Sequence, residues 1–221
     1  MRMRIVYAIG DIHGCYEQLL ELLRLIEKHR DGRSYRLVFL GDYIDRGPNS
    51  AAVIAHLRKL QSIDQQNVVC LAGNHEDMLL QAHQDRAYFW RWIENGGGKV
   101  LESYGIRKVS QIPAGDIDWL SQLPTIYEDE HRYFVHAGLR PYHAVKMEDR
   151  ETHLWIREDF LTVDFDFTKY VVHGHTAQMS GLPEVRQYRV NLDTACVYGH
   201  NLTAGVFSNT KGPAVEFISV H

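Results

Sequence analysis

Acidic, amide and imidazole side chains follow three apolar runs of the chain, and a glycine directly precedes them each time. The runs cover residues 4–9, 35–40 and 67–72, and their β-branched and large apolar residues are typical of strands. The turns after them are Gly10-Asp11-Ile12-His13-Gly14, Gly41-Asp42-Tyr43-Ile44-Asp45-Arg46-Gly47 and Gly73-Asn74-His75-Glu76. Two later apolar runs end in His136 and in His173-Gly174-His175. Because open α/β sheets bind ligands at the carboxyl ends of their strands, we expect these turns to form one site.

The donor atoms in these turns are oxygen and nitrogen, without sulfur. Carboxylates combined with imidazoles suit manganese, iron, zinc or cobalt far better than copper(I) or an iron–sulfur cluster. Six such side chains are more than one tetrahedral zinc needs, whereas two metals that share a bridging carboxylate would use them all. Such a pair is a standard device for activating water and stabilising an in-line displacement at phosphorus. The six candidate ligands are Asp11, His13, Asp42, Asn74, His136 and His175.

Two arginines and one histidine–aspartate pair extend this chemistry. Arg46 follows Asp45 in the second turn, and Arg157 lies in a Trp-Ile-Arg segment. Because a guanidinium matches two phosphate oxygens and keeps its charge, both arginines are candidates for binding a phosphate group. His75 is adjacent to a candidate ligand and could protonate a leaving alkoxide while Asp45 holds its ring. The combination indicates a phosphoester substrate.

The pattern around the turns predicts the elements that position them. Three times a strand is followed by a polar turn and an apolar helical stripe, as in residues 16–28, which is the rhythm of a largely parallel sheet. From residue 126 onward short strands predominate and predict a second, more antiparallel sheet. We therefore expect an α/β (mixed α+β) fold, with two facing mixed β-sheets in a sandwich flanked by helices.

Between the two sheet regions, residues 84–123 predict a mainly helical insertion or cap within a single domain spanning 1–221. This segment contains the aromatic run 88–93. We interpret its aromatic residues as core and not as a base-stacking surface, because no basic residue beyond the single Arg91 is interleaved with them.

The composition limits the partners. The chain has 221 residues and a formal net charge of −4, which gives no electrostatic reason to expect nucleic acid. No apolar run approaches the roughly 18 to 20 residues needed to span a bilayer, and the N-terminus lacks a signal-peptide pattern. We therefore expect a cytoplasmic protein with no membrane partner. Three scattered cysteines predict neither a disulfide framework nor structural zinc.

The three N-terminal turns, together with His136-Ala137-Gly138 and Gly174-His175-Thr176, resemble the ordered motifs of the PPP-type metallophosphoesterases. Within that group the likeness is greatest to the compact bacterial and phage serine/threonine protein phosphatases, and it extends from about residue 5 to about residue 207. The resemblance implies a calcineurin-like architecture with two divalent metals, commonly manganese. It also implies direct attack by metal-bound hydroxide, without a phosphoenzyme.

Carried over position by position, the resemblance implies a role for each candidate. Asp11 and His13 would bind the first metal, and Asp42 would bridge to the second. Asn74, His136 and His175 would complete the coordination of the second metal. Arg46 and Arg157 would bind the phosphate group of the substrate. His75 with Asp45 would act as the acid pair. His173 would either support a neighbouring ligand or be structural.

Three functions remain open at this point. We expect a serine/threonine protein phosphatase acting on phosphoproteins or phosphopeptides, because Glu76 completes a Gly-Asn-His-Glu motif in the form that protein phosphatases carry. The alternative is a symmetrical dinucleoside polyphosphate hydrolase, whose relatives usually carry aspartate at that position. A non-catalytic metal-binding module is a third reading, and a nuclease is disfavoured by the net negative charge.

Overall fold

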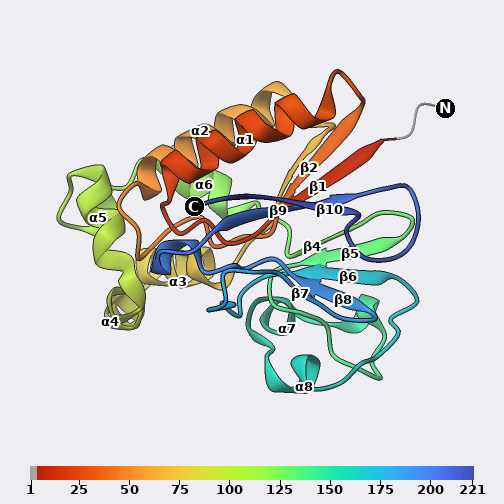
Figure 1. The fold of residues 1–221 in the computed structure, drawn as a ribbon. Coiled ribbons are helices and arrows are strands. Elements are labelled where there is room, and N and C mark those ends of the chain that lie inside the picture. The colour runs from red at the N-terminus through yellow and green to blue at the C-terminus, as the bar shows by residue number, and fades with distance from the viewer. Residues whose placement is uncertain (1–3) are drawn as a thin grey trace.

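The computed structural model describes residues 4–221, in which two five-stranded sheets face each other (Figure 1). The strands of the first sheet are β1 (Ile5–Ile9), β2 (Tyr35–Phe39), β3 (Val68–Cys70), β9 (Leu202–Phe207) and β10 (Glu216–Val220). Their order is β10-β9-β1-β2-β3, with β1, β2 and β3 parallel and β9 antiparallel to both of its neighbours, β1 and β10. This arrangement brings the carboxyl ends of the first three strands to one edge.

The second sheet is also mixed. Its strands are β4 (Ile126–Glu128), β5 (Arg132–Val135), β6 (Tyr170–His173), β7 (Glu184–Val185) and β8 (Arg189–Asn191). Their order is β4-β5-β6-β8-β7, and β5, β6 and β8 run parallel between two antiparallel edge strands. The predicted α/β sandwich of two facing mixed sheets is therefore confirmed. The expectation of a more antiparallel second sheet from residue 126 onward was wrong, because its three central strands are parallel and the last two strands of the chain pair with the first sheet.

Alternation along β1 shows how the layers are held together. Val6 and Ala8 pack into the interior between the sheets, together with Phe134 and Val172 from the second sheet. Tyr7 lies on the opposite face of β1, in the cluster that packs under the helices. Because successive side chains of a strand point to opposite faces, a strand buried on both sides reads as a continuous apolar run.

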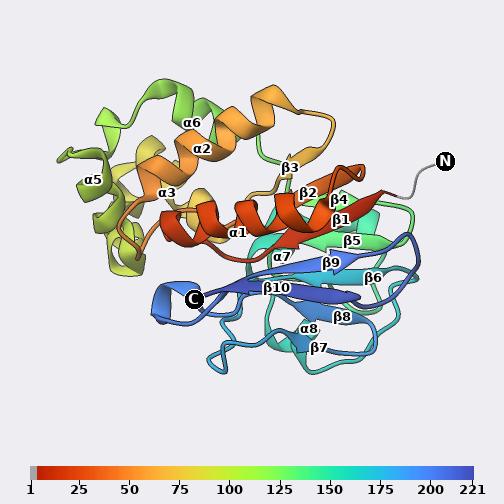
Figure 2. The same ribbon diagram turned by 45° about the horizontal axis from the view of Figure 1, so that its top comes forward.

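Three helices follow the three N-terminal strands. They are α1 (Tyr16–Arg30), α2 (Ser50–Ile63) and α3 (Asn74–Gln84). α1 and α2 lie on the outer face of the first sheet (Figures 1 and 2). α1 buries Leu19, Leu22 and Ile26 at helical spacing, which is why this segment is a helix. α3 starts at Asn74, so its first turn carries two of the predicted site residues.

The segment between the sheets is helical in most of its length. It contains η1 (Arg86–Tyr88), α4 (Phe89–Trp92), the π-helical turn η2 (Ile93–Gly97), α5 (Gly98–Tyr104), η3 (Val109–Gln111) and α6 (Ala114–Ser121). After β5 come η4 (Val145–Met147), α7 (Arg150–Trp155) and α8 (Glu158–Leu161), and η5 (Cys196–Tyr198) precedes β9. The sequence pattern did not predict α7, α8 or the two-residue strand β7. Within residues 4–221, no helix is both long and apolar enough to cross a bilayer.

Candidate metal centre and active site

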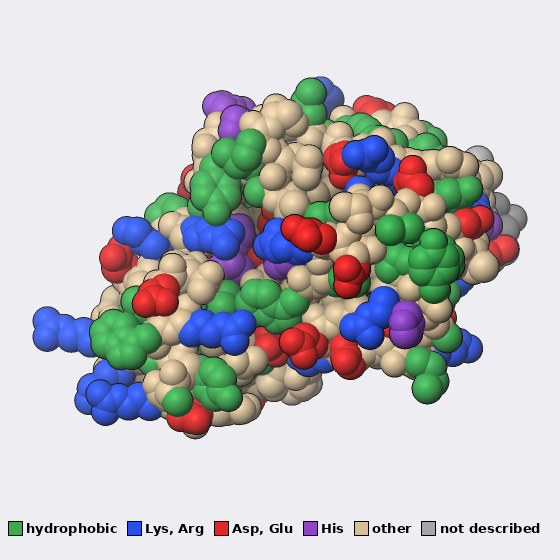
Figure 3. All heavy atoms as spheres, turned by 90° about the horizontal axis from the view of Figure 1, so that it is seen from below, with side chains coloured by type: hydrophobic (Ala, Val, Ile, Leu, Met, Phe, Trp, Pro, Cys, Tyr) green, Lys and Arg blue, Asp and Glu red, His purple; other side chains and the backbone are tan. Residues whose placement is uncertain are grey.

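The carboxyl ends of the parallel strands bring the predicted residues together. Asp11, Asp42 and Asn74 follow β1, β2 and β3, while His136 and His175 follow β5 and β6 of the facing sheet. All five side chains are buried. Seen from below, the surface shows histidine side chains recessed between arginine or lysine side chains (Figure 3). Both sheets thus contribute to one cluster.

Backbone strain is concentrated in this cluster. The φ angle is positive at five of the predicted residues, which is a conformation that non-glycine residues rarely adopt: His13 (45°), Asp42 (52°), Asp45 (69°), Arg46 (65°) and His175 (67°). Strained residues of this kind persist only where the surrounding structure enforces them, and they cluster at functional sites.

One group of donor atoms combines Asp42, His136 and His175, with the side-chain oxygen of Asn74 between them. Nδ1 of His136 donates to the Leu40 carbonyl oxygen, 2.9 Å away, so its Nε2 carries the lone pair. That lone pair lies 2.9 Å from Oδ1 of Asn74 and 3.3 Å from Oδ1 of Asp42, and both of those atoms are also acceptors. The only ring nitrogen that could donate here is Nδ1 of His175, 2.9 Å from the same Asn74 oxygen and 3.2 Å from Nε2 of His136, and one proton can satisfy only one of these acceptors. The group therefore holds more acceptors than donors, which fits a metal.

A second group combines His13, Asp42 and His75. Nδ1 of His13 donates to the Ile44 carbonyl oxygen, 2.7 Å away, and turns Nε2 toward Oδ2 of Asp42 at 3.4 Å. Asp42 is the only acid that belongs to both groups found among residues 4–221, which is the position that a bridging carboxylate requires. Asp11 lies outside both groups of mutually close atoms. Its two oxygens accept from the backbone N–H of His175, each at 3.2 Å.

The candidate histidine ligands have lone pairs that could bind a metal. Burial lowers the pKa of His13 to about 3 and that of His175 to about 2, so both imidazoles are neutral near pH 7 and offer a lone pair. Burial would raise the pKa of Asp42, but His136 and the other imidazoles around it lower that pKa well below its usual range. Asp42, the candidate bridging ligand, is therefore charged.

Asp193 is a further carboxylate of this cluster, and the sequence analysis did not include it among the site residues. Burial, followed by repulsion from Asp193 and Asp42, raises the pKa of Asp11 well above its usual value. Burial also raises the pKa of Asp193 to about 6. Three buried acids this close are unfavourable unless cations balance them, which again fits metals. Asp193 lies two residues after the end of β8, so the strand-end rule applied to the first three strands would have identified it.

His75 and Asp45, the predicted acid pair, are hydrogen-bonded to each other, and Trp92 also bonds to Asp45. Nδ1 of His75 donates to Oδ2 of Asp45 at 2.6 Å, and Nε1 of Trp92 donates to Oδ1 of Asp45 at 2.9 Å. Burial disfavours the charged imidazole, but the carboxylates of Asp42 and Asp45 outweigh it and raise the pKa of His75. Trp92 is fully buried, and the sequence did not connect it with the acid pair.

The two arginines lie at different depths. Nη1 of Arg46 is 2.9 Å from Nε2 of His13, inside the cluster. Arg157 is exposed, and its Nη1 donates to the Thr176 hydroxyl at 3.1 Å, one residue after His175. Both guanidinium groups are therefore close to predicted ligands, and their roles in binding phosphate stay predictions.

His173 faces away from the ligand cluster. Its Nε2 accepts from Nη1 of Arg189 at 3.2 Å, and its ring packs edge-on against Phe160. Both partners belong to the outer side of the second sheet. This residue stabilises the fold, as the sequence analysis expected.

Glu76 holds two ligand-bearing turns together. Its Oε2 accepts from the backbone N–H of Asp42 and of Gly73, and its Oε1 accepts from that of Tyr43, each at 2.8 Å. The side chain is fully buried. All its hydrogen bonds go to backbone N–H groups of these turns, so the structure assigns this side chain a supporting role.

We predict that Gly73→Ala disrupts the metal site. A Cβ at this position would clash with the side chain and the backbone nitrogen of Asp42. We expect the variant to lose at least about ten-fold in metal affinity, the loss typical when the support of a ligand is disturbed. Metal content after equilibrium dialysis measures this effect. Gly98→Ala is the matched control, because nothing lies within 4 Å of its added Cβ, and equal losses in both variants would contradict the prediction.

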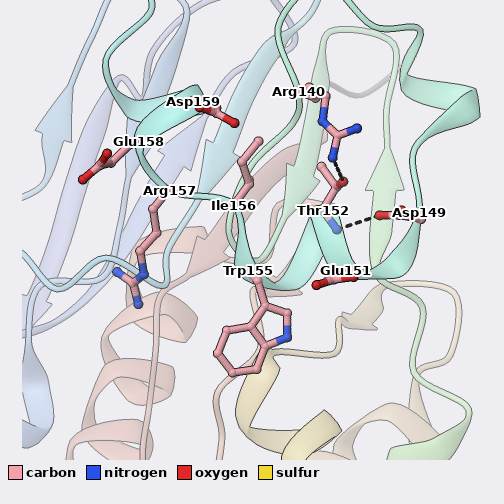
Figure 4. Close-up of a pocket in the computed structure, with 9 residues that line it drawn as sticks. All are labelled: Arg140, Asp149, Glu151, Thr152, Trp155, Ile156, Arg157, Glu158 and Asp159. Atoms are coloured by element: carbon pink, nitrogen blue, oxygen red, sulfur yellow. Dashed lines mark hydrogen bonds between the residues drawn. The ribbon is translucent and has the colours of Figure 1, made fainter.

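A cavity of about 340 Å³ opens beside the cluster. Its lining includes the side chains of Trp155, the last residue of α7, and Arg157, the residue before α8, which project on the same side (Figure 4). The Trp155 ring centroid lies 6.2 Å from that of His175. The rest of the lining carries Arg140 and four acids: Asp149, Glu151, Glu158 and Asp159.

The family of the chain follows from its sequence match and agrees with this site. The model of the calcineurin-like phosphoesterase family matches residues 5–203, so the chain belongs to that family. Members of this kind use divalent metals, and the chain supplies two groups of acidic and imidazole donors that could hold them.

Particular relatives narrow the comparison. The bis(5'-nucleosyl)-tetraphosphatase PrpE [asymmetrical] of Oceanobacillus iheyensis is 29% identical over 96% of this chain and 90% of its own length. A symmetrical bis(5'-nucleosyl)-tetraphosphatase of Coxiella burnetii is 36% identical, over 65% of this chain and 45% of its own length. The crystal structure of a proposed diadenosine tetraphosphatase has a TM-score of 0.72 and 26% identity, and the match covers 100% of this chain and 98% of that one.

Protein phosphatases share the fold alone. A cold-active protein tyrosine phosphatase has a TM-score of 0.66 at 18% identity, over 95% of this chain and 80% of its own. The expectation of a serine/threonine protein phosphatase acting on phosphoproteins or phosphopeptides was therefore wrong, since the relatives that match nearly the whole chain are named as dinucleoside tetraphosphatases. The physical reason is that Glu76, which decided the choice, is fully buried and bonds to the backbone of the turns.

Proposed function

We propose that this protein hydrolyses dinucleoside polyphosphates such as diadenosine tetraphosphate, and that it cleaves them asymmetrically into ATP and AMP. The observation that supports it is the match along 96% of this chain and 90% of a relative named as an asymmetrical tetraphosphatase. The symmetrical relatives align over only 45% of their own length. The cluster of buried donors at the strand ends is compatible with either cleavage pattern.

In this proposal the reactants are one dinucleoside polyphosphate and one water molecule, and the residues of the site have different roles. Arg46 and Arg157 hold phosphate oxygens. Their positive charges compensate the negative charge of the phosphate and orient the phosphorus atom. His75, protonated and fixed by Asp45, gives its proton to the oxygen that leaves. One water adds to a phosphorus, one P–O bond breaks, and the tetraphosphate becomes ATP and AMP.

Two divalent metals complete the proposal. Asp11 and His13 would hold one, Asn74, His136 and His175 the other, and Asp42 would bridge them. The metals would activate the water and neutralise charge on phosphate. We propose manganese, because the oxygen and nitrogen donor set suits it, although iron, zinc or cobalt would also fit. Residues 1–221 would act as a single domain, with the helical segment 84–123 as its cap.

Product analysis tests this function directly. The purified protein, supplied with Mn²⁺, is incubated with diadenosine tetraphosphate, and the nucleotides are separated by ion-exchange chromatography. We expect equimolar ATP and AMP, and a value of kcat/KM at least about 100-fold above that for a phosphoserine peptide, because the relatives are named for the dinucleotide.

Two outcomes would contradict the proposal. ADP as the main product would show symmetrical cleavage, the activity for which the partly matching relatives are named. Faster release of phosphate from the peptide than cleavage of the dinucleotide would reject the substrate class.

A further inference from the structure

A second cavity, of about 450 Å³, lies on the helical segment. Its wall is formed by the end of α3, by η1, by α4 and by the residues that lead into η3. Its lining shares no residue with the predicted metal ligands, Arg46 or Arg157. The volume lies within the roughly 300 to 1,000 Å³ typical of small-molecule sites.

Three permanent cations line this cavity. They are Arg86, Arg107 and Lys108, and the half-buried His83 lies beside them. Among residues 4–221, the side chains of these three cations form no ion pair and no hydrogen bond. No carboxylate belongs to the lining. Arginine and lysine side chains gather at the end of the molecule that carries α4 and α5 (Figures 1 and 3). The cavity therefore favours an anion.

Two aromatic rings line the same cavity. Trp90 is 68% exposed, and its ring packs edge-on against Phe89 with the centroids 5.4 Å apart. An exposed tryptophan face beside unpaired cations fits a planar base attached to phosphates, because bases stack on aromatic rings whatever their sequence. The interpretation of this segment as core holds for the buried Trp92 and fails for Trp90.

Distant parts of the segment come together here. Arg107 and Lys108 follow Trp90 by more than fifteen positions and reach it only in the folded chain. A search for basic residues interleaved with the aromatic run therefore could not detect them.

We propose that this cavity binds a nucleoside polyphosphate, with the base stacked on Trp90 and the phosphates held by Arg86, Arg107 and Lys108. Guanidinium groups suit phosphate because each presents a planar fork of donors. This nucleotide could be free, as ATP is, or it could be the half of a bound dinucleoside polyphosphate that lies away from the metal cluster. The second alternative rests on the proposed function. The inference that a nucleotide binds here does not depend on hydrolysis.

A residue that lines the cavity, Phe89, also contacts Trp92, which bonds to Asp45 of the predicted acid pair. Phe89 packs against Trp90 on one side and against Trp92 on the other, with centroids 6.2 Å apart in the second pair. Trp92 holds Asp45. A nucleotide on Trp90 therefore lies next to the helix that positions the predicted acid.

Calorimetric titration of the full chain in excess EDTA tests the proposal without metal or turnover. The probes are ATP, inorganic triphosphate and adenosine, and we expect ATP to bind at least about ten-fold more tightly than either part alone. Trp90→Ala should lower the affinity for ATP at least about five-fold, the lower end of the loss expected when a stacking ring is removed. The affinity for triphosphate should be unchanged. The double variant Arg107→Ala/Lys108→Ala should weaken both ATP and triphosphate.

Matched controls separate the cavity from a general surface effect. Tyr142→Ala and Lys146→Ala remove an exposed ring and an exposed cation elsewhere, and they should leave ATP affinity unchanged. Arg46→Ala should also leave it unchanged in EDTA, because that residue belongs to the metal cluster. Equal ATP affinity in Trp90→Ala and Tyr142→Ala would overturn the proposal, and so would triphosphate binding as tightly as ATP.

Steady-state kinetics distinguishes the two sources. If the distal half of the substrate occupies the cavity, Trp90→Ala raises KM for diadenosine tetraphosphate at least about five-fold and leaves KM for p-nitrophenyl phosphate unchanged. If a free nucleotide occupies it, both KM values are unchanged while ATP affinity still falls. Folding of each variant is checked by circular dichroism.

Discussion

Replacing Asp42 with asparagine is expected to lower kcat/KM for diadenosine tetraphosphate by at least about 10³-fold and to reduce the metal content of the protein. Asp42 belongs to both groups of donor atoms, at 3.4 Å from Nε2 of His13 and 3.3 Å from Nε2 of His136. An amide keeps the shape but removes the negative charge that both cations would share. Losing one preorganised electrostatic partner typically costs 10² to 10³ in rate, and this residue would serve two metals.

The measurement combines metal analysis by mass spectrometry with the nucleotide assay. Asp31→Asn is a matched control, because Asp31 also has a positive φ, of 45°, but is exposed at the end of α1. It should retain full activity and metal content. An Asp42→Asn protein that kept either two metals or wild-type activity would refute the proposed bridge.

The second large effect concerns His75. His75→Asn should retain metal but lose about 10² to 10⁴ in kcat, the usual contribution of a positioned acid. Because Asp42 and Asp45 raise the pKa of His75, its protonated form persists to higher pH than that of a free histidine. The wild-type rate should therefore fall on the alkaline side as pH rises through this raised pKa. The variant should lack that dependence.

Leaving-group chemistry provides an independent check on His75. The loss should be larger with phenyl phosphate, whose alkoxide-like oxygen needs a proton, than with p-nitrophenyl phosphate. His143→Asn, at an exposed histidine, serves as the control. Equal losses on both esters, or an unchanged pH profile, would show that His75 does not act as the acid.

Local patterns were sufficient to predict most of the architecture. Each N-terminal strand is a short apolar run that ends in glycine and a polar residue, so its position and the edge on which it ends could be read directly. Parallel pairing then brings Asp11, Asp42 and Asn74 to one edge. The short helices α7 and α8 could not be predicted this way, because each spans only six or four residues with little periodicity.

The parts of the site that were missed depend on long-range contacts. Trp92 holds Asp45 across 47 positions, and no local pattern links them. Glu76 illustrates the opposite error, because a motif that distinguishes families was interpreted as a sign of substrate, whereas its side chain binds the turns of Asp42 and Gly73. Its role could be determined only once both turns were placed in space.

The contacts of the helical segment have a consequence for shortening this protein. The carbonyl oxygen of Gly96 accepts from the backbone N–H of Arg46 at 3.2 Å, and the Ser103 hydroxyl accepts from the backbone N–H of Ala51 at 2.9 Å. Trp92 supports Asp45 from the same stretch. A shortened variant that lacks the helical segment 84–123 would therefore lose the contacts that hold Asp45 and Arg46 of the candidate active site. Truncation for engineering has to begin elsewhere.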